Sequence, residues 1–535
     1  MQFSSSYHSY NSTGLFSKLV VDYIAGNEKI RDYYSHRPDI DGIKLAIADK
    51  KKSTLNRELL YSELVKQYDG LVTSDKVSHN IVSLLNENTF TICTAHQPNI
   101  FTGHLYFIYK IVHAIKLADE LNGILKDYHF VPVYYMGSED ADLNELGEVT
   151  IDGEKHQWQT TQKGAVGRMK IDNAFISLIE NISLRLSNSL YGAEVMDKVR
   201  NIYTLDKTIQ QATLEFVNEL FSIYGLIVFI PDNLLFKKAC TSVFKKELTE
   251  QFSHKIIADT VAVFPSEYKI QASGRPLNLF YLKDDIRERI EKSEQGFLVR
   301  HTNIQFTEKE ILNELALFPD RFSPNVILRP LMQELLLPNM AFIGGGGELA
   351  YWLELKKIFD IVKTPFPVLI LRNSFTIIDA NTVKSIDRLA LKAIDFFAPL
   401  DEMTSSYVKK NAENKIDLKE NKIEIQKLYS EIKNIAAKSD PTLMNHVDAL
   451  LTNVLSKLES LETKMLRAER RKADHAVQQI QKIKMKLFPG DILQERVDNL
   501  LYFYSAYGVS FIEKLYENSS GLNQRFCILT ENVGL

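Results

Sequence analysis

Short apolar runs alternate with segments of helical periodicity between residues 89 and 372. The runs that predict strands cover 89–95, 129–136, 226–231, 325–329 and 367–372. Several are apolar throughout, as expected of strands buried on both faces of a parallel sheet. After the first run, apolar residues recur at helical spacing from Leu105 to Ile115 and predict a helix over about 103–121. The pattern therefore predicts an α/β fold with a parallel sheet.

Two stretches between the predicted strands differ in composition and are interpreted as insertions into the sheet domain. They cover about 147–220 and about 240–320. The first opens with a predicted hairpin whose turn is Asp152-Gly153. The second is expected to contain helices near 284–292 and 307–316. With these insertions, the core domain is predicted to span residues 1–384.

From about residue 385 the strand pattern ends and helical periodicity continues alone. Apolar residues are spaced by three or four positions, first from Ile425 to Ile435 and then from Val447 to Leu487. Ser439-Asp440-Pro441 separates the two stretches and is typical of a new helix start. We expect an α-helical antiparallel coiled-coil arm over 385–490. Residues 491–535 are expected to return to the core.

Composition and charge narrow the class of protein. The chain has 535 residues with 64 basic and 68 acidic side chains, and a net charge of −4 gives no general attraction to nucleic acid or to an anionic membrane. No apolar stretch approaches 18 residues, and the first 20 residues lack the features of a signal peptide. The three cysteines have no metal-binding spacing. These features predict a cytoplasmic protein without a structural metal, a membrane anchor or a nucleic-acid partner.

Polar residues follow the first predicted strand in a loop that leads into a helix. The loop carries His96, Gln97, Asn99, Thr102 and His104, together with Gly103. Free N–H groups and the helix dipole favour an anion at such a helix start. Gln97, Asn99, Thr102 and Gly103 are therefore expected to bind a ligand. A structural role is an equally good interpretation of the two histidines.

Acidic residues follow the second predicted strand. Glu139, Asp140, Asp142 and Glu145 lie within seven residues of one another. Ligands of open parallel sheets bind outside the carboxyl ends of the strands, where a carboxylate can hold an ammonium group or act as a general base. A solvated acidic loop would have the same composition.

Glycines and arginines mark two further candidate positions. The run Gly344, Gly345, Gly346, Gly347 and Glu348 precedes a predicted helix over 349–359 and could present N–H groups to a ligand. It lacks the spacing of a Walker loop or a dinucleotide motif, so a flexible turn is the alternative. Arg329 and the triplet Arg372, Asn373 and Ser374 follow predicted strands. An arginine there suits a carboxylate or phosphate, or equally a structural salt bridge.

Five segments of the chain resemble a known family, the bacillithiol biosynthesis cysteine-adding enzymes, also called the BshC or cysteine ligase family. In the family's order they are AHQPNIFTGHLYFIYKIVHAIKLA, VPVYYMGSEDADLNEL, LNLFYLKDDIRERI, FSPNVILRPLMQELLLPNMAFIGGGGELAYWLELK and KLFPGDILQERVDNLLYFYSAYG. The resemblance implies a Rossmann-like core with connective insertions and a C-terminal helical coiled coil. It also implies a homodimer formed through that coiled coil.

The resemblance implies the last step of bacillithiol synthesis, in which the carboxyl group of L-cysteine is joined to the amino group of glucosaminyl-malate. The family core is similar to class I aminoacyl-tRNA synthetases, which implies activation of cysteine by ATP, accompanied by Mg²⁺. Asp140 is the first candidate for the base and Glu139 the second. The loop at 97–104, Asp142, Arg329, the run 344–348, the triplet 372–374 and Arg496 are candidates for binding substrate or nucleotide.

Two departures from the class I pattern limit this comparison. The spacing of His96 and His104 is too long for the HxGH signature, so His104 is expected only as a phosphate contact, and no KMSKS-like loop is present. Two other functions stay open. The chain could be a non-catalytic nucleotide-binding scaffold that uses its coiled coil, or a nucleotidyl transferase for another small molecule. The ligase hypothesis requires that the loop near residue 100, the acidic residues near 140, the glycines near 345 and the two arginines converge at one edge of the sheet.

Overall fold

Five parallel strands form the central sheet of the larger of two structural units. They are β2 (Thr89–His96), β3 (His129–Met136), β6 (Ile227–Phe229), β12 (Asn339–Gly344) and β13 (Val368–Leu371). Their order across the sheet is β13-β12-β2-β3-β6, and every neighbouring pair is parallel. The chain builds outwards from β2 to β6 and then adds β12 and β13 on the other side of β2. The strand order therefore reverses between β2 and β12, as in doubly wound Rossmann-like folds.

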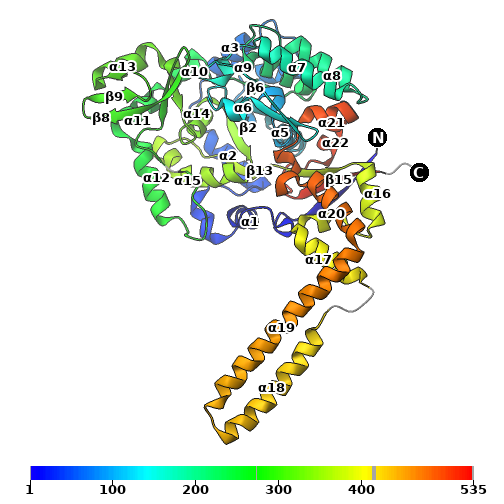
Figure 1. Cartoon of the computed structure of the whole chain (residues 1–535). Helices are drawn as coiled ribbons and strands as arrows, with labels where there is room; N and C mark the ends of the chain where they lie inside the picture. The colour runs from blue at the N-terminus through cyan, green and yellow to red at the C-terminus, as the bar shows by residue number, and fades with distance from the viewer. Residues whose placement is uncertain (1, 273, 413–416, 533–535) are drawn as a thin grey trace. The chain divides into compact units, whose positions relative to one another are not determined.

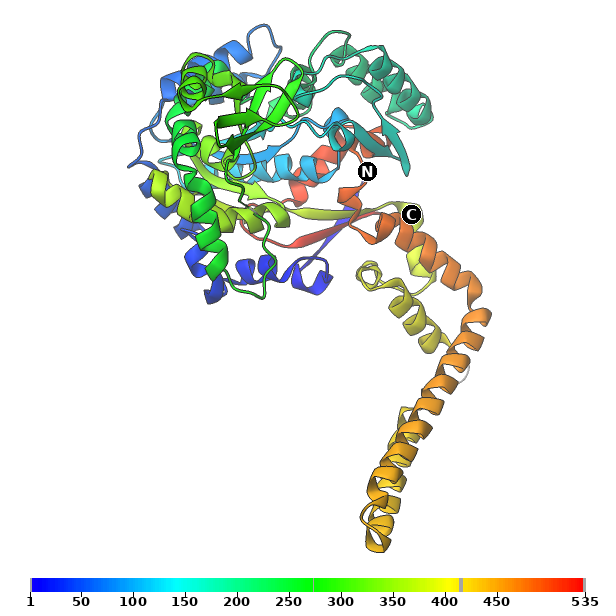
Figure 2. The ribbon, with the colours of Figure 1, turned by 60° about the vertical axis from the view of Figure 1, so that its left-hand side comes forward.

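The computed structural model describes residues 2–272, 274–412 and 417–532. The larger unit comprises Met1–Thr376 and Leu493–Leu529, and the smaller comprises Ile377–Ile492 and Thr530–Leu535. Figures 1 and 2 show the chain from two directions.

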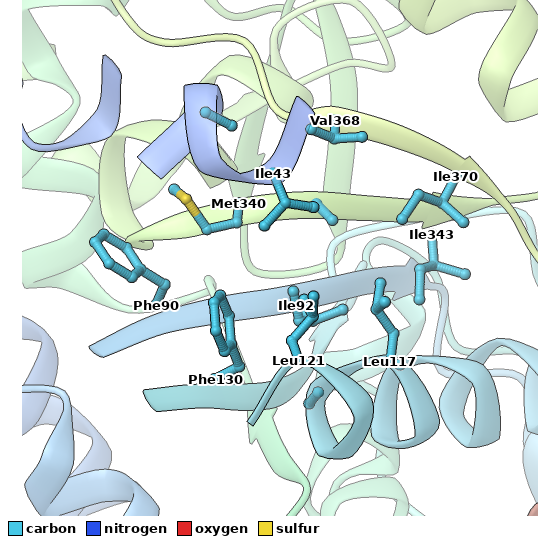
Figure 3. Packing of buried hydrophobic residues seen from close by; sticks show 14 of the residues in the cluster. Ile43, Phe90, Ile92, Leu117, Leu121, Phe130, Met340, Ile343, Val368 and Ile370 are labelled. Atoms are coloured by element: carbon cyan, nitrogen blue, oxygen red, sulfur yellow. The ribbon is translucent and has the colours of Figure 1, made fainter. Parts of the chain in front are cut away.

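Apolar side chains on one face of the sheet form a continuous core (Figure 3). Phe90 and Ile92 of β2 point to this face with Ile343 of β12, and the helices α2 (Ile40–Lys50) and α5 (Tyr106–Ile124) cover it. Phe342 is adjacent to Ile343 in the strand and so points to the opposite face. There its ring stacks on Trp352 of α15 (Gly346–Val362), with ring centroids 4.4 Å apart. Helices on both faces fix the strands and therefore the loops at their carboxyl ends.

The segment between β3 and β6 begins with a short helix and a hairpin. Its elements are α6 (Leu143–Leu146), β4 (Glu148–Ile151), β5 (Glu154–Gln157), α7 (Asn173–Leu186), α8 (Gly192–Ile202) and α9 (Ile209–Phe221). Asp152 and Gly153 both have positive φ at the turn between β4 and β5. The predicted hairpin is therefore confirmed.

The segment between β6 and β12 contains a second, antiparallel sheet in the order β10-β9-β8-β7-β11. Its strands are β7 (Leu279–Lys283), β8 (Ile286–Ser293), β9 (Gly296–Val299), β10 (Gln305–Phe306) and β11 (Phe322–Pro324). Its helices are α10 (Leu234–Ala239), α11 (Thr241–Glu250), α12 (Phe252–Val263), α13 (Glu308–Leu317) and α14 (Arg329–Leu336). Helix α13 confirms the helix predicted near 307–316.

Two elements predicted in this segment are wrong. The stretch 284–292 is strand β8, because Asp284 has a φ of 51° and turns the chain into a hairpin in which β8 pairs with β7 and β9. The stretch 325–329 is a turn, because the Asn325 side chain accepts hydrogen bonds from the N–H groups of Ile327 and Leu328. Pro330 then favours a helix start, so Arg329 is the first residue of α14 and follows no strand.

The remaining elements of the larger unit include helices near both ends of its sequence. They are β1 (Phe3–His8), α1 (Lys18–Ala25), α3 (Arg57–Gln67), α4 (Asp75–Ser83), α21 (Leu500–Tyr507) and α22 (Ser510–Asn518). Strand β1 belongs to a three-stranded sheet in the order β1-β15-β14, where β14 is Ser374–Ile378 and β15 is Phe526–Glu531.

The smaller unit is helical in its described residues between 380 and 487. Its helices are α16 (Ala380–Arg388), α17 (Leu400–Asn411), α18 (Lys419–Ser439), α19 (Leu443–Lys472) and α20 (Asp474–Leu487). Helices α18 and α19 run side by side (Figures 1 and 2). Lys422 pairs with Glu462 at 2.5 Å and Lys433 pairs with Asp448 at 2.6 Å, so the two helices are antiparallel. The predicted coiled-coil hairpin is confirmed. None of the helices in the described parts of the chain is long and apolar enough to cross a membrane.

Candidate functional site

A cavity of about 390 Å³ lies at the carboxyl ends of β2, β3 and β12. This is the edge of the sheet at which the strand order reverses, where ligands of such folds bind. The predicted site residues that line the cavity are Gln97, Glu139, Asp140, Arg329, Gly345, Gly347, Glu348, Arg372 and Arg496. The loop near residue 100, the acidic residues, the glycines and the arginines thus meet around one space, as the ligase hypothesis requires. Their roles toward a ligand stay predictions.

The other predicted residues do not line this cavity. They are Asn99, Thr102, Gly103, His104, Asp142, Gly344, Gly346, Asn373 and Ser374. The loop from Asn99 to His104 is held by Asn499, whose amide group donates to the carbonyls of Phe101 (2.9 Å) and Gly103 (2.5 Å). The helix predicted to begin near 103 begins at Tyr106, and the N–H of Leu105 donates to the carbonyl of Asp498. The segment 102–104 is therefore not a free helix start, which corrects the expectation.

Glu139 and Asp140 line the cavity in different environments. Glu139 is 7% exposed, and its carboxylate pairs with the Lys237 ammonium, which also donates to the carbonyl of Phe322 at 2.8 Å. Burial raises the pKa of Glu139, although Lys237 opposes the shift. Asp140 is more exposed, and its carboxylate accepts from the Gln97 amide at 3.3 Å and lies 3.8 Å from the Arg287 guanidinium. Asp140 is therefore the carboxylate that a ligand can reach more easily.

The guanidinium of Arg372 is buried and partly occupied by the protein itself. It donates from Nη2 to Glu495 at 2.5 Å, and from Nη1 to the Asn373 carbonyl and the Ser374 hydroxyl at 3.1 and 2.9 Å. These bonds make Asn373 and Ser374 supports of Arg372. Only Nε has no hydrogen-bond partner among the described residues. Arg372 thus forms a structural salt bridge, which was the alternative to a ligand contact in the sequence analysis. Its Nε–H group is still free to bind a ligand.

Arg329 is held by neutral partners. Its guanidinium donates to the Gln333 side chain and to the Tyr351 hydroxyl, each at 3.1 Å, and it lies over the Tyr135 ring. No carboxylate among the described residues lies within ion-pair distance of it. The positive charge of Arg329 at the cavity wall is therefore available to an anion.

Lys110 and Glu348 form an ion pair at the start of α15. The Lys110 ammonium also donates to the Ala95 carbonyl at 2.9 Å, and Glu348 accepts from the N–H of Gly345 at 2.8 Å. Burial lowers the pKa of Lys110. The pair fixes the first turn of α15 against the end of β2.

Four residues at or behind the cavity wall were missed by the sequence reasoning: Lys110, Lys237, Arg287 and Tyr351. Lys110 interrupts the apolar face of a helix, which is a signal that the sequence does contain. Arg287 was not considered, because the stretch 284–292 was wrongly predicted to be a helix and not a strand beside the cavity. Lys237 and Tyr351 carry no local pattern, because only the tertiary structure brings them to Glu139 and Arg329.

Comparison with known proteins gives consistent matches over nearly the whole chain. The family model described as "Bacillithiol biosynthesis BshC, N-terminal Rossmann-like domain" matches residues 3–373, and "Bacillithiol biosynthesis BshC, C-terminal coiled-coil domain" matches residues 375–531. Similar curated proteins come from Flavobacterium psychrophilum (38% identity, covering 97% of this chain and 98% of the relative) and Flavobacterium johnsoniae (36%, covering 98% and 99%). Another comes from Christiangramia forsetii (35%, covering 98% of each). All three are named "Putative cysteine ligase BshC".

Proposed function

The chain belongs to the BshC family of bacillithiol biosynthesis, and from this membership we propose that it is a ligase that joins the carboxyl group of L-cysteine to the amino group of glucosaminyl-malate. The observation that carries the proposal is the convergence of acidic and basic side chains on a single cavity at the carboxyl ends of the strands, at the reversal of strand order. The product is an amide, and the enzyme is expected to act in the cytoplasm.

The chemistry requires an activated carboxyl group, because a cysteine carboxylate does not react with an amine at neutral pH. We propose that ATP, bound with Mg²⁺, supplies this activation. A cysteine carboxylate oxygen bonds to the α-phosphorus and pyrophosphate leaves. The sugar nitrogen then bonds to the acyl carbon, AMP leaves, and one proton from the nitrogen passes to a base.

The cavity residues suit both steps of this reaction, the activation of the carboxyl group and the attack of the amine. Negative charge develops on the phosphate oxygens during activation, and the positive charge of Arg329 and the free N–H of Arg372 are suited to stabilise it. The sugar amine must be held and must lose a proton, for which a carboxylate within hydrogen-bond reach is suited. Asp140 is the first candidate, because it is the more accessible carboxylate. Glu139, held by Lys237, is the second.

We also propose that α18 and α19 mediate a homodimer. None of the 21 residues of α18 is buried, and Leu428, Ile432 and Ile435 are 54%, 39% and 66% exposed. Two helices alone do not cover this apolar surface. A second copy of the chain, pairing through the same stripe, would bury it.

The direct test incubates the purified protein with cysteine, glucosaminyl-malate and Mg²⁺, with and without ATP, and measures bacillithiol, AMP and ADP. The proposal predicts that product forms only with ATP and that one AMP appears for each amide bond. ADP in place of AMP would contradict adenylate formation but not the ligase activity. Absence of product with every nucleoside triphosphate would contradict the proposed function.

A further inference from the structure

The charges around the cavity are unevenly distributed. Lys110 neutralises Glu348, and Glu495 neutralises Arg372. Arg329 has only neutral hydrogen-bond partners among the described residues, and Arg496, which also lines the cavity, is exposed. Arg329 therefore adds positive charge to the cavity wall that no ion pair among the described residues neutralises.

Two residues that line the cavity have buried polar atoms without hydrogen-bond partners. Within the described chain, neither Nε of Arg372 nor Nε2 of His96 has a hydrogen-bond partner, although the two residues are only 3% and 7% exposed. Both residues line the cavity. Nε of Arg372 is always a donor, and a buried donor left without a partner costs about 1–3 kcal/mol, so a ligand that accepts a hydrogen bond from it would recover a substantial interaction.

The first turn of α15 faces the same space. The helix has 17 residues, and Gly345, Gly347, Glu348 and Tyr351 line the cavity at its start. The first N–H groups of a helix have no partner within the helix, and the dipole adds positive potential there. Glu348 satisfies the N–H of Gly345. The Arg329 guanidinium contacts the second turn of α15 through its hydrogen bond to Tyr351.

The glycines at this turn leave room that a side chain would fill. Gly345 has φ −74° and ψ 171°, a conformation open to any residue, so backbone freedom does not explain the glycine. A Cβ at Gly345 would lie 3.6 Å from Nε of Arg372, and a Cβ at Gly347 would meet no protein atom within 4 Å. A methyl group at either position would thus fit the protein. At Gly345 it would occupy space beside Nε of Arg372, and at Gly347 it would extend into open space at the cavity wall.

We propose that the first turn of α15, between Arg329 and Arg372, is the anion subsite of the cavity, and that Gly345 and Gly347 keep it open. The subsite would bind either the phosphates of the nucleotide or the malate carboxylates of the amino-sugar substrate. The choice of these two anions rests on the proposed function. An anion here leaves the Asp140 part of the cavity to the amino group that is acylated.

The test compares the wild-type chain with Gly345→Ala, Gly347→Ala and the control Gly123→Ala. Gly123 is an exposed helical glycine near the end of α5, and a Cβ there also meets no atom within 4 Å. It lies roughly 25 Å along the helix from Tyr106 at the cavity wall. Isothermal titration calorimetry would measure the Kd of inorganic pyrophosphate and of L-malate for each protein, and thermal unfolding would confirm that each is folded.

We expect Gly345→Ala and Gly347→Ala to raise the Kd of one probe at least tenfold, with the Gly123→Ala value unchanged. Loss of pyrophosphate binding would identify the nucleotide phosphates as the occupant, and loss of malate binding would identify the carboxylates. The proposed subsite is contradicted if both variants bind both probes with the Kd of the wild type, or if the wild type binds neither probe. Ligation by the wild type is measured in parallel, because it tests the proposed ligase activity separately from the anion subsite. Ligation can fail although the subsite binds an anion, and it can succeed although the subsite does not.

Discussion

Glu139 and Asp140 are adjacent in the sequence, yet the fold gives them different properties. The Glu139 carboxylate is buried against Lys237, whereas Asp140 keeps one side open to the cavity. The sequence pattern identified the acidic stretch but not this difference, because Lys237 is about 100 positions away and carries no local signal.

Replacing Asp140 by asparagine tests its assignment as the base. The amide side chain of the Asp140→Asn variant would keep a similar shape and could still contact Gln97, but it could not accept the proton of the amine. We expect kcat for ligation to fall by about 10²- to 10⁴-fold, the usual contribution of a general base. Steady-state assays of product formation would measure it, with the exposed Asp127→Asn as a control. A kcat within threefold of wild type would exclude Asp140 as the base.

Replacing Lys237 by methionine would leave Glu139 buried without its cation. Removing one partner of a buried ion pair costs about 3–5 kcal/mol, so we expect a loss of that order in the free energy of unfolding at pH 7.5. Denaturant titrations would measure it. The double variant Glu139→Gln with Lys237→Met removes both charges and should recover most of the stability. A double variant no more stable than the single one would contradict this coupling.

The loss of stability caused by Lys237→Met should depend on pH in a defined direction. The folded state raises the pKa of Glu139 above its unfolded value of about 4.3, so the folded protein binds that proton more tightly. The stabilisation that comes from this tighter proton binding is fully present below about pH 4.3, and it is lost as the pH rises through the pKa of Glu139 in the folded state. Lys237→Met removes a group that lowers this pKa, so its destabilisation should shrink as the pH falls from 7.5 to 5. If the difference in the free energy of unfolding between the wild type and Lys237→Met stays constant or grows as the pH falls, the pairing of Glu139 with Lys237 is contradicted.

At the scale of elements, local patterns predicted some parts of the fold and failed at others. Strands β2 and β3 are long apolar runs with a helix between them, and both were found at nearly their observed bounds. Strand β12, the neighbour of the central strand β2, was missed because it ends in the glycine run, which was interpreted as a loop. Strand β8 is rich in charged residues and becomes a strand only by pairing with β7 and β9. Such tertiary contacts override local propensity.

The apolar stripe of α18 predicts self-association. Replacing Ile432 and Ile435 together by glutamate places two charges on the surface proposed to pair. We expect the wild-type chain to be a dimer and this variant to be a monomer with unchanged helix content. Sedimentation equilibrium and circular dichroism would measure both, with Asn434→Glu as a control on the same helix. A wild-type monomer, or a variant that still dimerises, would contradict the homodimer.

At the scale of the whole molecule, the sequence predicted which segments would meet but not how they interact. Loops that follow parallel strands share one edge of a sheet, so Gln97 and Asp140 could be grouped before the structure was known. Gly345 was added on the evidence of its glycine run alone, since the strand β12 before it was not predicted. Arg329 was grouped with them for a wrong reason, since it begins a helix and follows no strand. The ion pairs that occupy Glu348 and Arg372 depend on Lys110 and Glu495, and side-chain pairing across that distance has no signal in a single sequence.

The proposed ligase activity requires that ligation takes place in the cavity at the reversal of strand order. A crystal structure with cysteine and a non-hydrolysable ATP analogue tests this most directly. We predict that both ligands occupy that cavity, with the nucleotide phosphates or the cysteine carboxylate within hydrogen-bond distance of Arg329 or Arg372. Ligands bound at separate places, with the cavity between Asp140 and Arg372 empty, would contradict the mechanism.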